Sequence, residues 1–245
     1  MLALAVIPGI LLLIIVWKFD SVEKEPPQLL VKLFAFGALT VVSAILLRIG
    51  GLRLFRSLFD NSSSLWFMLL DCFLLTALVQ EGGKLLVLKL ITWKNKEFNY
   101  TFDAVVYSVC VSLGFAILLN VLYCIKFGMN GTLIRAVFSV PGHAMNAVFM
   151  GYFYGLARYA KGAGDKKAER THMLEALIVP LVMHGFFDLC TGADRPVFYV
   201  LFVIYEVVII ASAVKQFLKL SKNDTLIPGM EYTLSDAWDE EEVAK

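Results

Sequence analysis

The sequence predicts an all-α polytopic membrane protein, a bundle of about seven transmembrane helices with a polar cavity inside the membrane. Composition is the first observation behind this prediction. Of 245 residues, 59% are hydrophobic and 18% are charged, and the mean hydropathy is +0.73. Soluble domains carry about a quarter charged residues, so these values argue against a water-soluble enzyme. The formal net charge of +1 gives no basis for nucleic-acid binding, which needs a basic surface.

The second observation is the length of the apolar stretches. A hydrocarbon core of about 30 Å needs about 20 mostly apolar residues per helix. The first stretch lacks the basic segment and cleavage site of a signal peptide, so it is expected to be a retained span. The third is long enough to be tilted or to extend beyond the bilayer. The seven predicted spans are 2–18, 29–47, 65–91, 103–124, 132–157, 173–192 and 196–218.

Lysine and arginine residues in the connections predict the orientation, because cytoplasmic loops carry the excess of positive charge. With the N-terminus outside, fifteen of these residues fall in inner segments and five in outer ones. The N-terminus is therefore expected outside and the C-terminus in the cytoplasm. The Gly- and Lys-rich segment 158–171 is expected to be a cytoplasmic turn that lies on anionic lipid.

The domain organisation is simple. Residues 1–220 are expected to form one seven-span membrane domain, and residues 221–245 an acidic cytoplasmic tail. No internal repeat is visible, which argues against transporters built from inverted repeats. The acidic residues that define the tail are Asp236, Asp239, Glu240, Glu241 and Glu242.

All four cysteines fall in or at the ends of predicted spans, where they are expected to be small apolar side chains that fill space. On the predicted topology Cys124 and Cys190 both reach the outer face. A disulfide bond between these two is the alternative, because oxidation is possible outside the cytoplasm.

Ionisable residues inside spans are costly and usually mark function. The third span contains Gln80-Glu81-Gly82-Gly83-Lys84. Glu81 and Lys84 are three residues apart, so they share a helix face and can neutralise each other. The paired glycines between them would let a neighbouring helix approach closely.

The fifth and sixth spans hold two of the three histidines. Pro141 has no backbone N–H, so it removes a helical hydrogen bond and frees a carbonyl oxygen one turn earlier. Such a break is more typical of a functional site than of a helix that only packs against its neighbours. Steps of four from His143 reach Ala147, Gly151 and Gly155, so His143 should face a close helix neighbour. In the sixth span, His184 and Asp188 are four residues apart and share a face.

Each histidine alone is explained by packing, but three helices that place Glu81, His143 and His184 at similar depth indicate one shared polar site. Three kinds of chemistry suit this set. A carboxylate and an imidazole can deprotonate water while a second imidazole stabilises an oxyanion. Two histidines and one or two carboxylates can instead bind a divalent metal that activates water. A proton-coupled transporter also uses such residues.

Motifs in a fixed order extend over most of the chain. They are Asp20-Ser-Val-Glu23-Lys24-Glu25-Pro26, Gln80-Glu81-x-x-Lys84, Asp103-x-x-x-Tyr107, Gly114-Phe115-Ala116, Asn120-x-x-Tyr123, Arg135 with Pro141-Gly142-His143, and His184-x-x-x-Asp188. Each motif alone is weak, but the ordered set resembles the PrsW-type intramembrane proteases. That family lies within a wider group that includes CAAX-prenyl endopeptidases and bacteriocin-processing enzymes.

The resemblance implies an intramembrane endopeptidase of a bacterial plasma membrane that cuts membrane-anchored proteins, with anti-sigma factors as the best-known substrates. It also implies site residues. The catalytic set is Gln80, Glu81, His143, His184 and Asp188. The supporting set is Lys84, Asn120, Arg135 and Asn146. The family name favours a metal such as zinc, with Glu81, His143, His184 and Asp188 as candidate ligands, whereas activation of water by glutamate and histidine needs none.

Two departures from the family pattern bear on activity. Gln80 stands where the family has the first acid of a Glu-Glu-x-x-Lys motif, and Leu119 stands where a Glu usually precedes the Asn. Glutamine cannot accept a proton at neutral pH. Three explanations are open: a natural inactive homologue, an inactivating substitution, or Glu81 as the base. Glu206, in the seventh span, pairs with a cation or supplies the missing carboxylate.

From these residues we expect Glu81 to be the acid that acts with His143 on water, with His184 and Asp188 as an oxyanion or ligand pair and Lys84 as the charge partner of Glu81. The alternative function is a non-catalytic scaffold or receptor that binds substrate helices, as the related gamma-secretase scaffold subunit does. A proton-linked transporter comes third.

Overall fold

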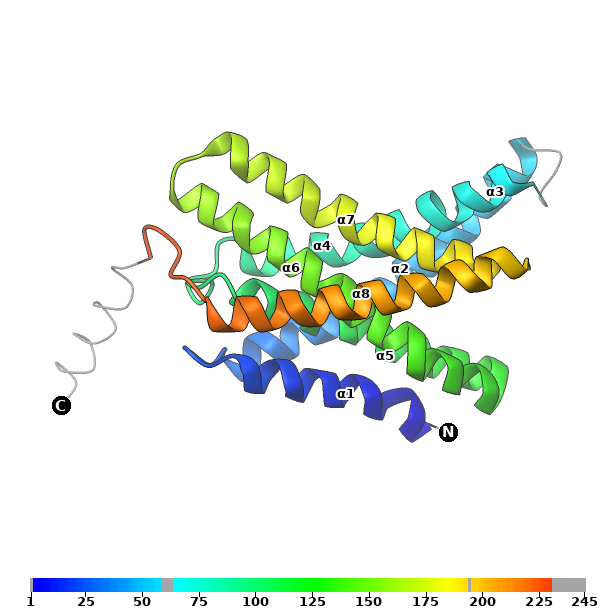
Figure 1. Ribbon diagram of the computed structural model, residues 1–245, viewed down its shortest axis with the longest axis horizontal. Coiled ribbons are helices and arrows are strands. Elements are labelled where there is room, and N and C mark those ends of the chain that lie inside the picture. The colour runs from blue at the N-terminus through cyan, green and yellow to red at the C-terminus, as the bar shows by residue number, and fades with distance from the viewer. Residues whose placement is uncertain (1, 59–63, 194, 231–245) are drawn as a thin grey trace.

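The structure is a computed structural model that describes residues 2–58, 64–193 and 195–230. In these residues the chain is helical, and seven of its helical segments are long and apolar enough to cross a membrane. This confirms the predicted fold class. The helices run side by side along the long axis of the molecule (Figure 1).

Each of the seven predicted spans corresponds to a helical segment, and the second, fifth and sixth extend well beyond the predicted ends. The elements are α1 (Leu2–Phe19), α2 (Pro27–Leu58), α3 (Leu65–Leu70), η1 (Asp71–Leu78), α4 (Val79–Thr92), α5 (Asp103–Ile134), η2 (Arg135–Ser139), α6 (Val140–Gly162), α7 (Lys166–Gly192) and α8 (Pro196–Lys222). The third span consists of α3, η1 and α4. The chain reverses at Gly128, whose φ of 71° favours glycine, so the fourth and fifth spans are Asp103–Met129 and Thr132–Gly162.

The structure corrects the predicted turn at 158–171. α6 continues to Gly162 and α7 begins at Lys166, so only residues 163–165 connect them. The Asp165 carboxylate caps α7 by accepting hydrogen bonds from the backbone N–H groups of Lys167 and Ala168, at 3.0 and 2.9 Å. Charged helix ends extend beyond an apolar stretch, and for that reason hydropathy placed the end of α6 too early, at 157, and the start of α7 too late, at 173.

α5 is the central helix of the bundle, and 78% of its most apolar window is buried. α6 packs directly on it. A Cβ atom added at Gly151 would lie 2.6 Å from the Val105 Cα, and one at Gly155 would lie 2.7 Å from the Thr101 carbonyl oxygen. This confirms the predicted small-residue stripe. Gly82 has no comparable contact: its nearest neighbour would be 4.0 Å away, so the expected close approach at that position is absent.

The bundle has two ends. The N-terminal face carries the start of α1, the ends of α2 and α7, and the start of α8, and it lies to the right in Figure 1. The opposite end, the C-terminal face, carries the connections after α1, α4, α6 and α8. There the segment after α8 packs against residues 99–101: the Thr101 N–H donates to the Thr225 carbonyl, and Ile227 is fully buried.

The predicted acidic tail at 221–245 is described only as far as residue 230. Its defining acidic residues, Asp236 to Glu242, lie outside the described residues. The four cysteines are free and buried, as expected of apolar side chains that fill space, and no disulfide bond joins Cys124 to Cys190.

Candidate active site within the membrane bundle

A short π-helical segment precedes each of two groups of ionisable residues along the chain. The π-helix η1 ends at Leu78, two residues before Gln80, and the π-helix η2 ends at Ser139, four residues before His143. Such turns shift the helix register and occur often at functional sites. The break predicted at Pro141 therefore takes the form of a π-turn.

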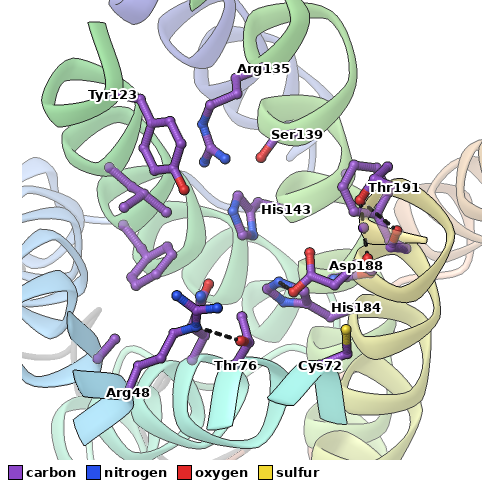
Figure 2. A pocket seen from close by; sticks show the side chains of 18 of the residues that line it. Arg48, Cys72, Thr76, Tyr123, Arg135, Ser139, His143, His184, Asp188 and Thr191 are labelled. Atoms are coloured by element: carbon purple, nitrogen blue, oxygen red, sulfur yellow. Dashed lines mark hydrogen bonds and ion pairs between the residues drawn. The ribbon is translucent and has the colours of Figure 1, made fainter. Parts of the chain in front are cut away.

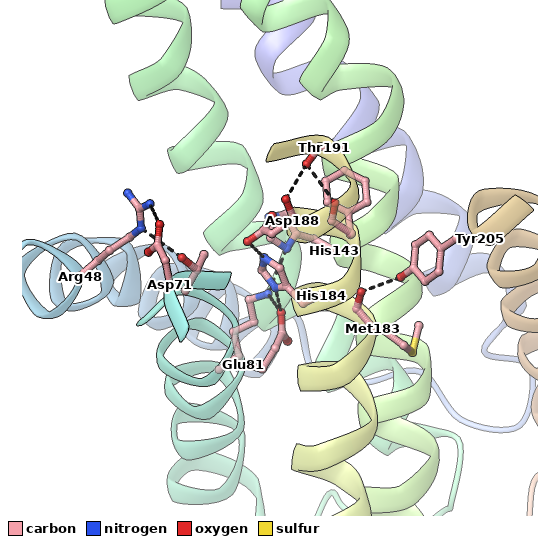
Figure 3. Close-up of polar contacts among 12 residues, drawn as sticks. Arg48, Asp71, Glu81, His143, Met183, His184, Asp188, Thr191 and Tyr205 are labelled. Carbon is pink, nitrogen blue, oxygen red and sulfur yellow. Dashed lines mark hydrogen bonds and ion pairs between the residues drawn. The ribbon is translucent and has the colours of Figure 1, made fainter. Parts of the chain in front are cut away.

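Four buried side chains from three spans contact one another. Figure 3 labels three of them, Glu81, His143 and His184, which lie close together. The Glu81 Oε1 atom lies 2.8 Å from the Lys84 Nζ atom and 2.6 Å from the His184 Nδ1 atom. The Lys84 Nζ atom also lies 3.1 Å from the His143 Nδ1 atom. Lys84 thus connects Glu81 to His143, and we name these four residues the polar cluster.

Burial makes the pairing in the polar cluster necessary. Glu81 and Lys84 are both 0% exposed, and His143 and His184 are 5% and 6% exposed. Charges removed from water are very costly unless an opposite charge lies beside them. The Glu81 carboxylate and the Lys84 ammonium satisfy this condition, as their spacing of three residues predicted.

α5 holds the polar cluster in place from behind. The Lys84 Nζ atom lies 4.8 Å from the centre of the Phe115 ring, and that ring packs edge-on against His143. The Ser112 hydroxyl donates a hydrogen bond of 2.8 Å to the His143 carbonyl oxygen. The role of Ser112 was not predicted, because one serine in an apolar helix carries no distinctive pattern.

The hydrogen bonds assign a proton to each imidazole. An ammonium group only donates, so the His143 Nδ1 atom accepts from Lys84, and the neutral ring carries its proton on Nε2. An ionised carboxylate only accepts, so His184 donates from Nδ1 to Glu81, and its Nε2 atom is free to accept in the neutral ring. Toward a ligand, His143 can therefore donate a hydrogen bond from Nε2, whereas His184 can accept one at Nε2.

A cavity of about 640 Å³ lies beside the polar cluster, and its lining includes residues near the N-terminal face such as Arg48 and Thr191. Figure 2 shows side chains that line it. Both cluster histidines line it, whereas Glu81 and Lys84 do not. Its wall is formed by α2 and α8 together with the third to sixth spans. Its other polar lining residues are Arg48, Asp71, Thr76, Gln80, Tyr123, Lys126, Arg135, Ser139, Asn146, Asp188, Thr191, Tyr205 and Glu206.

Gln80 and Asp188 are the predicted catalytic residues that line this cavity beside the histidines. The Gln80 Oε1 atom is buried and has no hydrogen-bond partner among the described residues. The Asp188 Oδ2 atom lies 3.5 Å from the His184 Nε2 atom, so the predicted spacing of four does bring them to one face. Position 80, rather than position 81, therefore faces the cavity.

The supporting residues separate into two groups. Asn146 and Arg135 line the cavity, and the Arg135 guanidinium lies 4.1 Å from the centre of the Tyr123 ring. Asn120 is elsewhere, because its Nδ2 atom donates to the Ala5 carbonyl oxygen and so joins α5 to α1. The structure does not bring Asn120 to the site.

The cavity wall also contains an ion pair that was not predicted. The Arg48 guanidinium lies 2.8 Å from the Asp71 carboxylate and 3.1 Å from the Thr76 hydroxyl. The second span was predicted to end at residue 47, which would leave Arg48 in the outer connection that follows. The greater length of α2, which continues to Leu58, places it within the helix instead.

Glu81, His143 and His184 each offer one ligand atom, and these atoms lie within 4.8 Å of one another. The residue types and the spacing suit a divalent cation. The Lys84 ammonium, however, already contacts Glu81 and His143. A metal bound through the Glu81 Oε1 and His143 Nδ1 atoms would have to displace the ammonium, and one bound through the unpartnered Glu81 Oε2 atom would lie close to its positive charge. The residues in this arrangement therefore do not fit a resident metal.

The fold and this site define a class: multi-pass membrane proteins with a buried ionisable cluster beside an intramembrane cavity. Residues 25–213 match the family described as PrsW family intramembrane metalloprotease, and the chain belongs to this family. The family match and the relatives' names support a peptidase. No solved structure matches the chain.

The curated relatives include proteins named protease PrsW. The one from Clostridioides difficile (strain 630) is 32% identical over 210 residues, which cover 84% of this chain and 85% of the relative. The one from Bacillus subtilis (strain 168) is 29% identical over 202 residues, which cover 79% and 84%. The one from Geobacillus kaustophilus (strain HTA426) is 29% identical over 188 residues, which cover 77% and 78%. The likeness thus extends over most of the chain.

Proposed function

We propose that this chain is an intramembrane endopeptidase that hydrolyses a peptide bond in a membrane-anchored protein, with anti-sigma factors as a candidate substrate class. One observation carries the proposal: Gln80, His143, His184 and Asp188 line one cavity, and Glu81 and Lys84 hold the two histidines from behind. The charge distribution supports an N-terminus outside the cell, so the cavity would extend toward the outer face.

In the proposed mechanism, residue 80 holds the attacking water. A glutamate there would take the proton from that water as general base. The Gln80 carboxamide can hydrogen-bond the water but cannot take its proton. This leaves the His184 Nε2 atom and the Asp188 carboxylate as weaker acceptors on the same wall. Turnover by the present chain should therefore be low.

The other cluster residues orient the reactants. The proton on the His143 Nε2 atom can be donated to the oxyanion that forms as water attacks the carbonyl. Glu81 fixes the His184 ring, as the aspartate of a catalytic triad fixes its histidine. This proposal replaces Glu81 with residue 80 as the base, because Oε1 of Glu81 is bound to both His184 and Lys84.

Cleavage of a single-span membrane reporter by the Gln80→Glu protein in nanodiscs tests the proposal, with the cut mapped by mass spectrometry. We expect a cut in or beside the membrane segment that disappears with His184→Ala. The third histidine provides the matched control. His172 pairs with Glu175 on the surface of α7, so His172→Ala should keep activity. Equal loss in both histidine variants would contradict the proposal.

The second candidate function is a scaffold that binds substrate helices without cutting them. Gln80 and Leu119, two departures from the family pattern, favour it. Binding would use the cavity and would not need the base. A Gln80→Glu protein that binds the reporter and never cleaves it would make this the leading function.

A further inference from the structure

α8 is the span with the least buried surface, yet an acid occupies one of its few buried positions. Only 11% of its most apolar window is buried. Its buried residues are Glu206, Ala213 and Phe217, and Glu206 is 7% exposed. An acid in the membrane interior is costly and usually has a function, and the mechanism above does not use this one.

Aromatic contacts fix the direction in which Glu206 points. Phe202 packs edge-on against both Phe138 of η2 and Phe187 of α7, at 5.7 and 5.5 Å between ring centres. The Tyr205 hydroxyl donates to the Met183 carbonyl oxygen at 2.8 Å. Glu206 lies one turn after Phe202 on the same face of α8. It therefore faces inward, and it lines the cavity that contains the two cluster histidines.

Glu206 differs from the other acids of the cavity wall. Asp71 forms an ion pair with Arg48, and Asp188 lies beside His184. The Oε1 atom of Glu206 is buried and has no hydrogen-bond partner in the part of the chain that the structure describes. A buried acceptor without a donor costs free energy, and a ligand that supplies the donor recovers it.

We propose that Glu206 forms a recognition subsite for the substrate, in which its carboxylate binds a basic side chain of the membrane-anchored segment. A lysine or arginine side chain suits the position because its apolar stem can lie along the cavity wall while its charged end donates to Glu206. The inference rests on the proposed function and adds to it a preference for one class of substrate side chain.

Peptide binding tests the subsite without needing catalysis. The probes are synthetic single-span peptides that carry, at one scanned position, lysine, its neutral isostere norleucine, or glutamate. Affinity is measured for the full chain in nanodiscs. At one position we expect lysine to bind roughly tenfold more tightly than norleucine, the size of one charge-assisted hydrogen bond. Glutamate there should bind more weakly than norleucine.

Variants of Glu206 assign the preference to this residue. Glu206→Gln keeps the shape and should reduce the ratio of lysine to norleucine affinity nearly to one, while Glu206→Lys should reverse the order of lysine and glutamate peptides. Glu175→Gln removes an acid on the surface of α7 and should leave the ratio unchanged. Thermal unfolding of each variant checks that it is folded, and Glu206→Gln alone suffices if Glu206→Lys does not fold.

A charge preference that persists in Glu206→Gln would overturn the subsite, as would no preference at any position or no peptide binding at all. These results are distinct from failure of the proposed function. Cleavage by Gln80→Glu with a charge preference independent of Glu206 would remove the subsite alone. If Glu206 sets the preference for lysine peptides but the Gln80→Glu protein cleaves no reporter, the subsite stands and the scaffold function is favoured over the peptidase.

Discussion

The Nδ1 atom of His184 lies 2.6 Å from the Oε1 atom of Glu81, so an imidazole of α7 and a carboxylate of α4 form one buried pair. The same oxygen also accepts from Lys84. Glu81 is therefore engaged in holding the site together, and the cavity wall carries residue 80 instead.

Removal of the Lys84 ammonium should destabilise the fold. Lys84→Met leaves the buried Glu81 carboxylate without its cation, and breaking a buried ion pair in this way costs about 3–5 kcal/mol. Thermal unfolding in detergent measures the loss, and Glu81→Gln with Lys84→Met should recover part of it. The surface pair His172–Glu175 has the same spacing, so His172→Ala should cost less than about 1 kcal/mol. Equal losses would contradict the central role of Lys84.

The C-terminal face should make stability depend on pH. Burial raises the pKa of Glu25, in the connection between α1 and α2, to about 7, although Tyr107 donates a hydrogen bond to it. The folded state thus binds this proton more tightly than the unfolded chain. The stabilisation that Glu25 gives to the folded state is fully present below about pH 4.5. It is lost as the pH rises toward about 7, and the free energy of unfolding falls by up to about 3 kcal/mol.

Glu25→Gln should remove this part of the pH dependence, and thermal unfolding between pH 5 and pH 8 measures it. Tyr107→Phe removes a donor to the ionised carboxylate, so it should move the loss to higher pH. An unchanged slope in Glu25→Gln would show that other groups cause the dependence.

Purified protein should contain much less than one zinc ion per chain. The Lys84 ammonium contacts two of the three candidate ligands, so a cation there meets a like charge. Elemental analysis of the purified protein checks this, and Lys84→Ala should bind more zinc than the parent chain. One tightly bound zinc per parent chain, removed only by chelators, would contradict the arrangement.

Single cysteines at Arg53 and Lys166 should label from opposite sides of the membrane, with Lys166 on the cytoplasmic side. Three spans separate these positions, at the end of α2 and at the start of α7. A cysteine-free background excludes the four native thiols, and an impermeant maleimide reports the exposed side. Labelling of both positions from one side would contradict the seven-span topology.

Local spacing predicted the contacts within single helices. Apolar length placed seven spans, and the spacings of three and four predicted that Glu81 faces Lys84 and that His184 faces Asp188. Contacts between helices depend on their relative rotation, which one sequence does not reveal. The contact of Lys84 with His143 and that of Glu81 with His184 were therefore not predicted as pairs.

Helix rotation also explains why the positions of Gln80 and Glu206 in the cavity wall could not be predicted from the sequence. Neighbouring positions 80 and 81 differ by about 100° around a helix, and only the packed bundle determines which one meets the cavity. η1, directly before them, shifts that rotation further. Glu206 was visible as an acid in an apolar span, but its place in the cavity depends on how Phe202 packs between η2 and α7.

The most direct measurement compares cleavage of a membrane-anchored reporter by the parent chain and by Gln80→Glu. If residue 80 is the position of the general base, restoring the acid should raise the rate by about 10²–10⁴-fold. His143→Ala in the same protein should abolish the gain, because both residues act on one reaction. No gain in Gln80→Glu with reporter binding intact would contradict this role, and so would rapid cleavage by the parent chain.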